Sequence, residues 1–133
     1  CLGAEQEYVR FGTDLQLVKR NFEHVVHEDW IYLNFNQTLS GLTLKTSADL
    51  IDYINQLRAS RQINHYFGTT VMTYEFLHPR VFGQGFFNDD FEQILANMPD
   101  NTQQEQTAKD YMAGIQKEIN DIIIISSVYA MVI

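Results

Sequence analysis

Two pairs of side chains in this 133-residue sequence have the spacing that a metal ion requires of its ligands. His24 and His27 lie three residues apart, and Glu75 and His78 repeat that separation. Positions three or four apart share one face of a helix, where imidazoles and carboxylates bind zinc or iron. Glu-x-x-His also occurs in di-iron carboxylate bundles, but those sites need a second such motif and two further glutamates. The sequence lacks these, so the four residues are weak metal candidates and we predict no metal site and no cofactor.

The sequence carries no arrangement typical of an enzyme. It has no Gly-x-Ser-x-Gly motif, which would present a nucleophilic serine. The paired carboxylates Asp89 and Asp90 stand at an expected helix start, where capping explains them better than acid–base catalysis. The run Gly83-Gln84-Gly85 lacks the third glycine and the ribose-binding acid of a dinucleotide site. We therefore expect a protein without catalytic activity.

Aromatic side chains are concentrated in the middle of the chain. Eight of the sixteen Phe and Tyr residues fall between Tyr66 and Phe91. Within that window, residues 80–87 form a predicted loop that carries two glycines and Phe82, Phe86 and Phe87. Such rings either fill the centre of the core or are presented to a partner, since aromatic residues dominate the energetics of protein interfaces. Filling of the core is the favoured interpretation, and these three phenylalanines are the candidate partner-binding residues.

The elements that position these residues are mainly predicted helices. Apolar residues recur every three or four positions from Tyr8 to Val25, which predicts a helix over about residues 5–29 with a break near Gly12. Thr46 and Asp49 approximate a capping box for a second helix.

Three further helix boundaries follow from local signals. The second helix is expected to end near Ala59, and a short helix begins at Asn88 or Asp89 with Phe91, Ile94, Leu95 and Met98 facing inward. The last helix starts near Thr102 and carries Met112, Ile115, Ile119, Ile122 and Ile123 on one face.

Two segments are ambiguous between helix and strand. Residues 31–45 alternate apolar and polar positions around a turn at Ser40-Gly41, which fits a small β-hairpin, although a continued helix followed by a loop is slightly favoured. Residues 63–77 have apolar positions at helical spacing, but Thr69 to Tyr74 has strong β propensity. The overall prediction is a mainly α protein, a compact bundle of four or five helices in a single domain over residues 1–133, with 1–4 as a tail. An α+β fold is the alternative.

Charge excludes two classes of partner. Nine basic and seventeen acidic residues give a net charge of −8 without a cluster of Lys and Arg. Such a surface repels nucleic acid, and it does not adhere by charge to an anionic membrane. The longest apolar run, over residues 122–133, spans about twelve residues and is too short for a membrane-spanning helix.

The single cysteine, Cys1, is the first residue. A processed chain that begins at cysteine resembles a mature bacterial lipoprotein, and the resemblance implies an acylated Cys1. It also implies the bacterial cell envelope, with an outer-membrane anchor and a domain that faces the periplasm or the exterior. A fragment boundary at Cys1 is the alternative.

These observations lead to one predicted function and one alternative. The prediction is a non-catalytic envelope lipoprotein, an accessory, assembly or structural subunit that binds another envelope protein, for instance in a larger complex. The alternative is a small-ligand or metal-binding helical domain that uses the interior near His24, Glu75 and His78.

Overall fold

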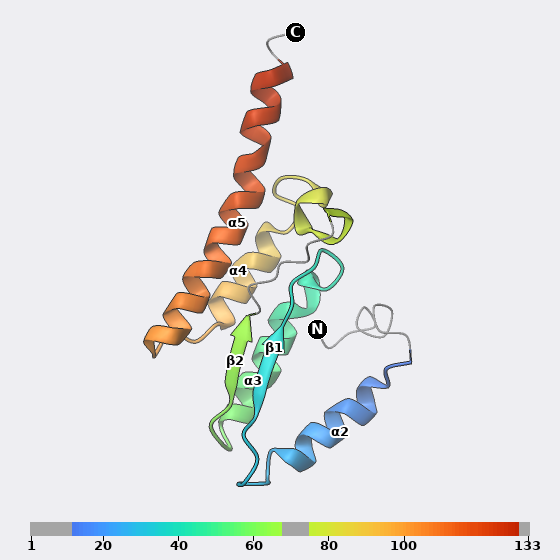
Figure 1. Ribbon diagram of the computed structural model, residues 1–133, viewed down its shortest axis with the longest axis vertical. Helices are drawn as coiled ribbons and strands as arrows, with labels where there is room; N and C mark the ends of the chain where they lie inside the picture. The colour runs from blue at the N-terminus through green and yellow to red at the C-terminus, as the bar shows by residue number, and fades with distance from the viewer. Residues whose placement is uncertain (1–11, 68–74, 131–133) are drawn as a thin grey trace.

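The computed structural model describes residues 12–67 and 75–130, with side-chain detail for 12–64 and 76–121 (Figure 1). The described residues form four α-helices, two strands and three short 3-10 helices. These are, in chain order, α2 (Leu15–Val25), β1 (Asn34–Gln37), η1 (Leu44–Thr46), α3 (Ser47–Arg58), β2 (Asn64–Phe67), η2 (Glu75–Leu77), η3 (Pro79–Phe82), α4 (Asn88–Asn97) and α5 (Gln103–Ala130). The prediction of a mainly helical fold is confirmed.

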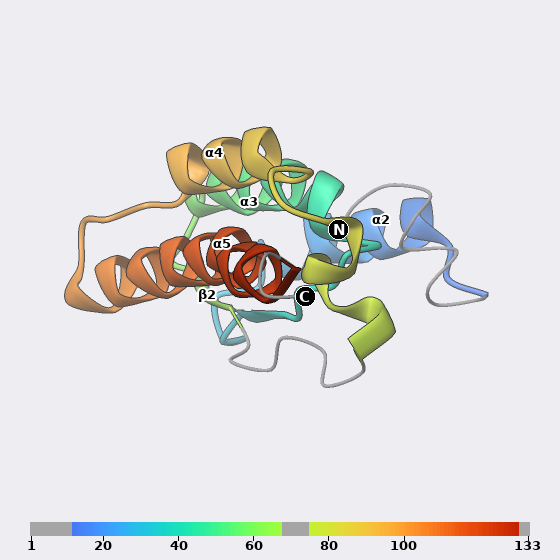
Figure 2. The same ribbon diagram turned by 90° about the horizontal axis from the view of Figure 1, so that it is seen from above.

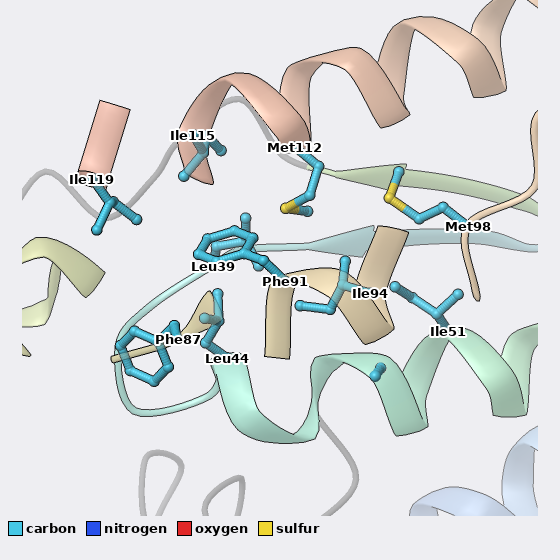
Figure 3. Packing of buried hydrophobic residues seen from close by; sticks show 11 residues of the cluster. Leu39, Leu44, Ile51, Phe87, Phe91, Ile94, Met98, Met112, Ile115 and Ile119 are labelled. Atoms are coloured by element: carbon cyan, nitrogen blue, oxygen red, sulfur yellow. The ribbon is translucent and has the colours of Figure 1, made fainter. Parts of the chain in front are cut away.

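The larger hydrophobic core lies between α3, α4 and α5 (Figure 3). Ile51 of α3, Phe91 and Ile94 of α4, and Met112 of α5 are at most 1% exposed. On α5 the buried residues continue with Ile115 and Ile119, which is the spacing of one helix face. The inward faces predicted for α4 and α5 are therefore confirmed over the residues with side-chain detail.

Local hydrogen bonds test the two capping signals considered at helix starts. The Thr102 hydroxyl accepts from the Glu105 amide at 3.2 Å, and the Glu105 carboxylate accepts from the amides of Asn101 and Thr102 at 3.0 and 3.1 Å. This reciprocal capping box starts α5 where the sequence predicted. The box predicted at α3 is wrong, because the Thr46 hydroxyl donates backwards to the Thr43 carbonyl and caps no α3 amide.

Helix α2 is shorter than the predicted helix over residues 5–29. Gly12 has a positive φ of 88°, and Asp14 then caps the helix by accepting from the Leu17 amide at 3.0 Å. The predicted break near Gly12 is therefore confirmed, while residues 5–11 lie outside the described ranges. At its other end α2 stops at Val25, where the Glu28 amide donates to the Val25 carbonyl at 3.1 Å and the guanidinium of Arg61 donates to the carbonyls of Val25 and Val26, both at 3.4 Å.

The two strands form a parallel pair in which Asn34 lies opposite Asn64. Parallel strands need a crossover connection, and here η1 and α3 provide it. Figure 2 shows the strands on one side of the molecule and α3 with α4 on the other. A second, smaller hydrophobic cluster includes Ile54 of α3 and Phe35 of β1, and the Phe35 ring contacts the Phe22 ring of α2 with centroids 5.0 Å apart.

The structure resolves both ambiguous segments. β1 forms inside residues 31–45, but the hairpin is wrong, because Leu44 begins η1 and the partner strand lies much later in the chain. The Ser47 hydroxyl donates to the Thr43 carbonyl at 3.0 Å, which turns the chain directly into α3. A continuous helix over 63–77 is also wrong, since β2 occupies 64–67; residues 68–74 lie outside the described ranges.

Candidate partner-binding surface

The predicted partner-binding rings lie between η3 and the first turn of α4. Pro79 opens η3, where its fixed φ suits a helix start, and Nδ1 of His78 accepts from the Arg80 amide at 3.2 Å. After η3 the chain passes through Gly83 and Gly85, whose φ values are +92° and +76°. Residues with a Cβ rarely adopt these angles, so the two glycines allow the chain to turn back on itself.

The turn brings all three phenylalanine rings together. The rings of Phe82 and Phe86 stack with centroids 5.4 Å apart and an interplanar angle of 27°. Phe87 meets both of them edge-on, at 5.2 Å from Phe82 and 4.8 Å from Phe86. Both arrangements are favourable for aromatic quadrupoles, so the trio forms one ordered cluster.

Burial divides this cluster into an exposed and a buried part. Phe82 and Phe86 are 40% and 51% exposed, whereas Phe87 is 3% exposed and belongs to the core between α3, α4 and α5 (Figure 3). This corrects the expectation that all three rings would be presented together. Phe87 is a core residue beneath the surface, and Phe82 and Phe86 are the rings that remain exposed.

A distant segment supports the two exposed rings. The Phe82 ring lies against Gly41, and the Gly41 amide donates to the Leu77 carbonyl at 2.7 Å. Lys45, which follows shortly after, places its ammonium 5.1 Å from the centroid of the Phe86 ring, within cation–π distance. We call the surface made by Phe82, Phe86 and Lys45 the aromatic face.

The loop that carries these rings is also fastened to α5. The side chain of Asn120 accepts from the Gly85 amide at 3.2 Å and donates to the Asn88 side-chain oxygen at 3.0 Å. Asn120 of α5 therefore binds both the loop and the first residue of α4. Contacts of the rings with Phe87 and Gly41, and the bonds of Asn120 to the adjoining loop, order the aromatic face.

The electrostatic environment of this region is mixed. Lys45 forms no ion pair with any residue that the structure describes, so its charge is available at the aromatic face. Burial and the nearby charge of Arg80 lower the pKa of His78, against the opposing effect of Glu118 on α5. Neutral His78 can accept the Arg80 hydrogen bond that starts η3, which a doubly protonated ring cannot do.

The weak metal candidates are not gathered into one place. His24 and His27 are exposed at the C-terminal end of α2, while His78 lies half-buried between η2 and η3; Glu75 lies in η2, outside the range with side-chain detail. Figure 1 shows α2 and the η2–η3 region well apart. Within the described part of the chain, no group of three or more His, Cys, Asp or Glu is placed to hold a metal ion.

Sequence reasoning missed Gly41, Lys45 and Asn120. Each acts on the aromatic face from a segment far from it in the chain, and none stands in a recognisable motif. An asparagine on a long amphipathic helix and a turn glycine are ordinary features, so only the tertiary structure shows their role.

The comparisons with known proteins add no relatives. Cys1 lies outside the described residues, and in the ranges that the structure does cover no helix combines the length and hydropathy needed to cross a bilayer. No protein-family model, no curated protein and no solved structure matches this chain.

Proposed function

We propose that this protein is a non-catalytic accessory or assembly subunit that binds another protein through the aromatic face. The observation that carries the proposal is the stacked pair Phe82 and Phe86, which is exposed and yet packed against Gly41 and Phe87. Two ordered rings in contact with water gain free energy when a partner covers them, on the order of 25 cal/mol per Å² of apolar surface. Because they are already fixed, little side-chain entropy is lost on binding.

Exposed apolar residues adjacent in the chain to the contact between Gly41 and Phe82 favour an interface that is larger than the two rings. Leu42 and Val81, which are 38% and 52% exposed, adjoin Gly41 and Phe82 in the chain. A few central aromatic residues carry most of the energy of an interface, while the surrounding residues exclude water. In this proposal Phe82 and Phe86 are the anchors, and Lys45 lies at the edge of the contact.

The test begins by identifying the partner at the aromatic face itself. Phe86 is replaced by the photo-crosslinking analogue benzoylphenylalanine in the native host, and the crosslinked protein is identified by mass spectrometry. Recovery of that same protein is then compared between the parent chain and the double variant Phe82→Ser/Phe86→Ser. We expect the double variant to lose the partner while its thermal midpoint stays close to that of the parent.

A matched variant controls for the loss of any exposed apolar side chain. Leu17 on α2 is 42% exposed and remote from the aromatic face, so Leu17→Ser should retain the partner. Equal recovery with the double variant and with Leu17→Ser would contradict the proposal. A double variant that unfolds would show instead that the rings act as core residues.

The proposed location is the bacterial cell envelope, with attachment through an acylated Cys1. A lone thiol in an oxidising compartment is reactive, and acylation removes that reactivity. The intact mass of protein from the native host should exceed the polypeptide mass by several acyl chains. An unmodified Cys1 in that protein would exclude the lipid anchor and leave the binding proposal unaffected.

A further inference from the structure

A second exposed aromatic pair lies away from the aromatic face. Trp30 and Tyr32 are 78% and 93% exposed, the two highest values among the large apolar side chains that the structure describes. They belong to the connection between α2 and β1, which turns at the lower end of the molecule in Figure 1. Segment η3, which carries Phe82, lies toward the opposite end. One partner segment at Trp30 therefore leaves the aromatic face open.

This connection is ordered by a guanidinium group. Arg61 donates to the carbonyl of Glu28 at 2.8 Å and to that of Ile31, and more weakly to those of Val25 and Val26, both at 3.4 Å. A planar fork of donors suits this set of converging carbonyls. The connection is consequently a fixed platform, and its exposed side chains need no ordering when a partner binds.

The indole ring is oriented as well. Its Nε1–H donates to the carboxylate of Glu28 at 2.9 Å. This bond places a negative charge at the edge of the indole and leaves the ring faces exposed. A Trp face is the strongest cation–π acceptor among side chains, and a carboxylate beside it adds direct attraction for a cation.

The segment that carries this pair is acidic. Residues 23–32 contain three carboxylates, on Glu23, Glu28 and Asp29, and no Lys or Arg. Arg61 places one positive charge at this connection, where its guanidinium is directed at backbone carbonyls. The whole chain also has a net charge of −8, which favours the approach of positively charged partners.

We propose that Trp30 and Tyr32 form a second recognition surface, which binds a Lys- or Arg-bearing segment of a partner protein. The cation lies over an aromatic face, and Glu28 and Asp29 pair with it or with its neighbour. An acidic segment is repelled from this surface, and a purely apolar one leaves the carboxylates without a partner. This proposal rests on different residues from those of the aromatic face and is independent of it.

The chain carries its own reporter for the test, because Trp30 is its only tryptophan. The probe is a blocked peptide with three arginines separated by glycines, titrated against the intact protein while Trp30 emission is recorded. The matched probe has citrulline in place of arginine, which keeps the shape and removes the charge. We expect a saturable change in emission with the arginine peptide and none with the citrulline peptide over the same range.

Variants then locate the effect. Glu28→Gln/Asp29→Asn should weaken binding of the arginine peptide about five-fold, the effect expected for exposed ion pairs, and Tyr32→Ala should weaken it about three-fold. The control Glu92→Gln/Asp121→Asn removes the same net charge at exposed positions elsewhere and should change binding less than about two-fold. Phe82→Ser/Phe86→Ser should leave binding of the arginine peptide unchanged.

Three outcomes would overturn the proposal. One is an equal response to the citrulline peptide, which would make the contact apolar. Another is equal weakening of arginine-peptide binding by Glu28→Gln/Asp29→Asn and by Glu92→Gln/Asp121→Asn, which would make the binding a consequence of net charge alone. The third is the absence of a saturable change up to about 5 mM peptide, a concentration beyond which affinity is too weak to matter.

Discussion

The ring of Phe82 lies against the α-carbon of Gly41. A Cβ built on Gly41 would come within 2.3 Å of ring atom Cε2 and 2.9 Å of Cδ2, closer than real Cβ atoms approach other atoms. The described glycines with positive φ are Gly12, Gly83 and Gly85, so Gly41 has an ordinary backbone conformation. The fold therefore uses the missing side chain of Gly41, not its conformational freedom.

The substitution Gly41→Ala should displace the Phe82 ring and leave the fold intact. Because Phe82 is 40% exposed, its ring can rotate outward, and we expect the free energy of unfolding to fall by only about 1–2 kcal/mol. The aromatic face loses its stacked arrangement, so recovery of the crosslinked partner should drop severely. Urea unfolding and partner recovery are measured on the same preparation. Unchanged partner recovery would show that the contact between Gly41 and Phe82 is not needed for binding.

The same added methyl group should have the opposite effect at Gly114. This residue lies inside α5, and nothing stands within 4 Å of a Cβ built there. Alanine is more favourable than glycine in a helix interior, so Gly114→Ala should raise the free energy of unfolding by about 0.5–1 kcal/mol. Partner recovery should not change. A loss of stability in urea unfolding would contradict the open space seen around Gly114.

Replacing Asn120 should loosen the loop before α4. The variant Asn120→Ala removes the bonds to Gly85 and Asn88, at a cost of about 1–2 kcal/mol. Asn120→Asp retains an acceptor for the Gly85 amide and loses the donor to Asn88, so its effect should be intermediate. Hydrogen exchange of the Gly85 amide reports the change directly. If exchange at Gly85 is equal in all three proteins, Asn120 does not hold the loop.

The parts of this fold that the sequence predicts are the ones that depend on neighbouring residues. The buried face of α5 follows from the spacing of Met112, Ile115 and Ile119, and its start follows from Thr102 and Glu105. Both signals act within a few residues and need no knowledge of the partner element. The end of α2 was less predictable, because the turn that follows it packs against Arg61, which lies far along the chain.

Contacts between distant segments could not be predicted in the same way. Alternation near Phe35 indicates a strand, but the pattern does not say that its neighbour is β2 or that the pair is parallel. Phe86 and Phe87 are adjacent and identical in type, yet one is 51% exposed and the other 3%. Both residues precede α4, and Phe87 belongs to the same buried cluster as Leu44, which lies far away in the chain.

Stability should depend on pH through His78. The folded protein lowers the pKa of His78 below its ordinary value of 6.5, mainly through burial. As the pH falls through 6.5, the unfolded chain therefore binds a proton that the folded chain resists, and the free energy of unfolding decreases. The free energy of unfolding stops decreasing below the pKa of His78 in the folded protein. The total decrease is small because the His78 ring is partly exposed.

The variant His78→Asn tests this dependence. Asparagine can accept the Arg80 amide at the start of η3, as His78 does, but it does not titrate. Urea unfolding between about pH 5 and 7 should therefore show a flatter profile in His78→Asn than in the parent. Identical slopes in the two proteins would rule out His78 as the source of the pH dependence.

Substitutions of Arg61 should alter both stability and the environment of Trp30. Arg61→Met removes the guanidinium donor from the carbonyls of Glu28 and Ile31, while the Glu28 carbonyl keeps the Ile31 amide, and the expected loss is about 1–2 kcal/mol in the free energy of unfolding. The connection between α2 and β1 then loosens, and the indole loses its fixed bond to Glu28. Trp30 emission should shift in the folded variant.

Arg58 supplies the matched comparison for this last prediction. It also donates to a backbone carbonyl, that of Ile63 at 3.0 Å, but it does not touch the connection that carries Trp30. Arg58→Met should therefore reduce stability without shifting the emission. Arg61→Lys, which keeps the charge but replaces the fork by a single ammonium, should fall between the parent and Arg61→Met in both measurements. An emission shift of equal size in the Arg58 and Arg61 variants would mean that general loosening, and not the guanidinium beneath the loop, controls the position of Trp30.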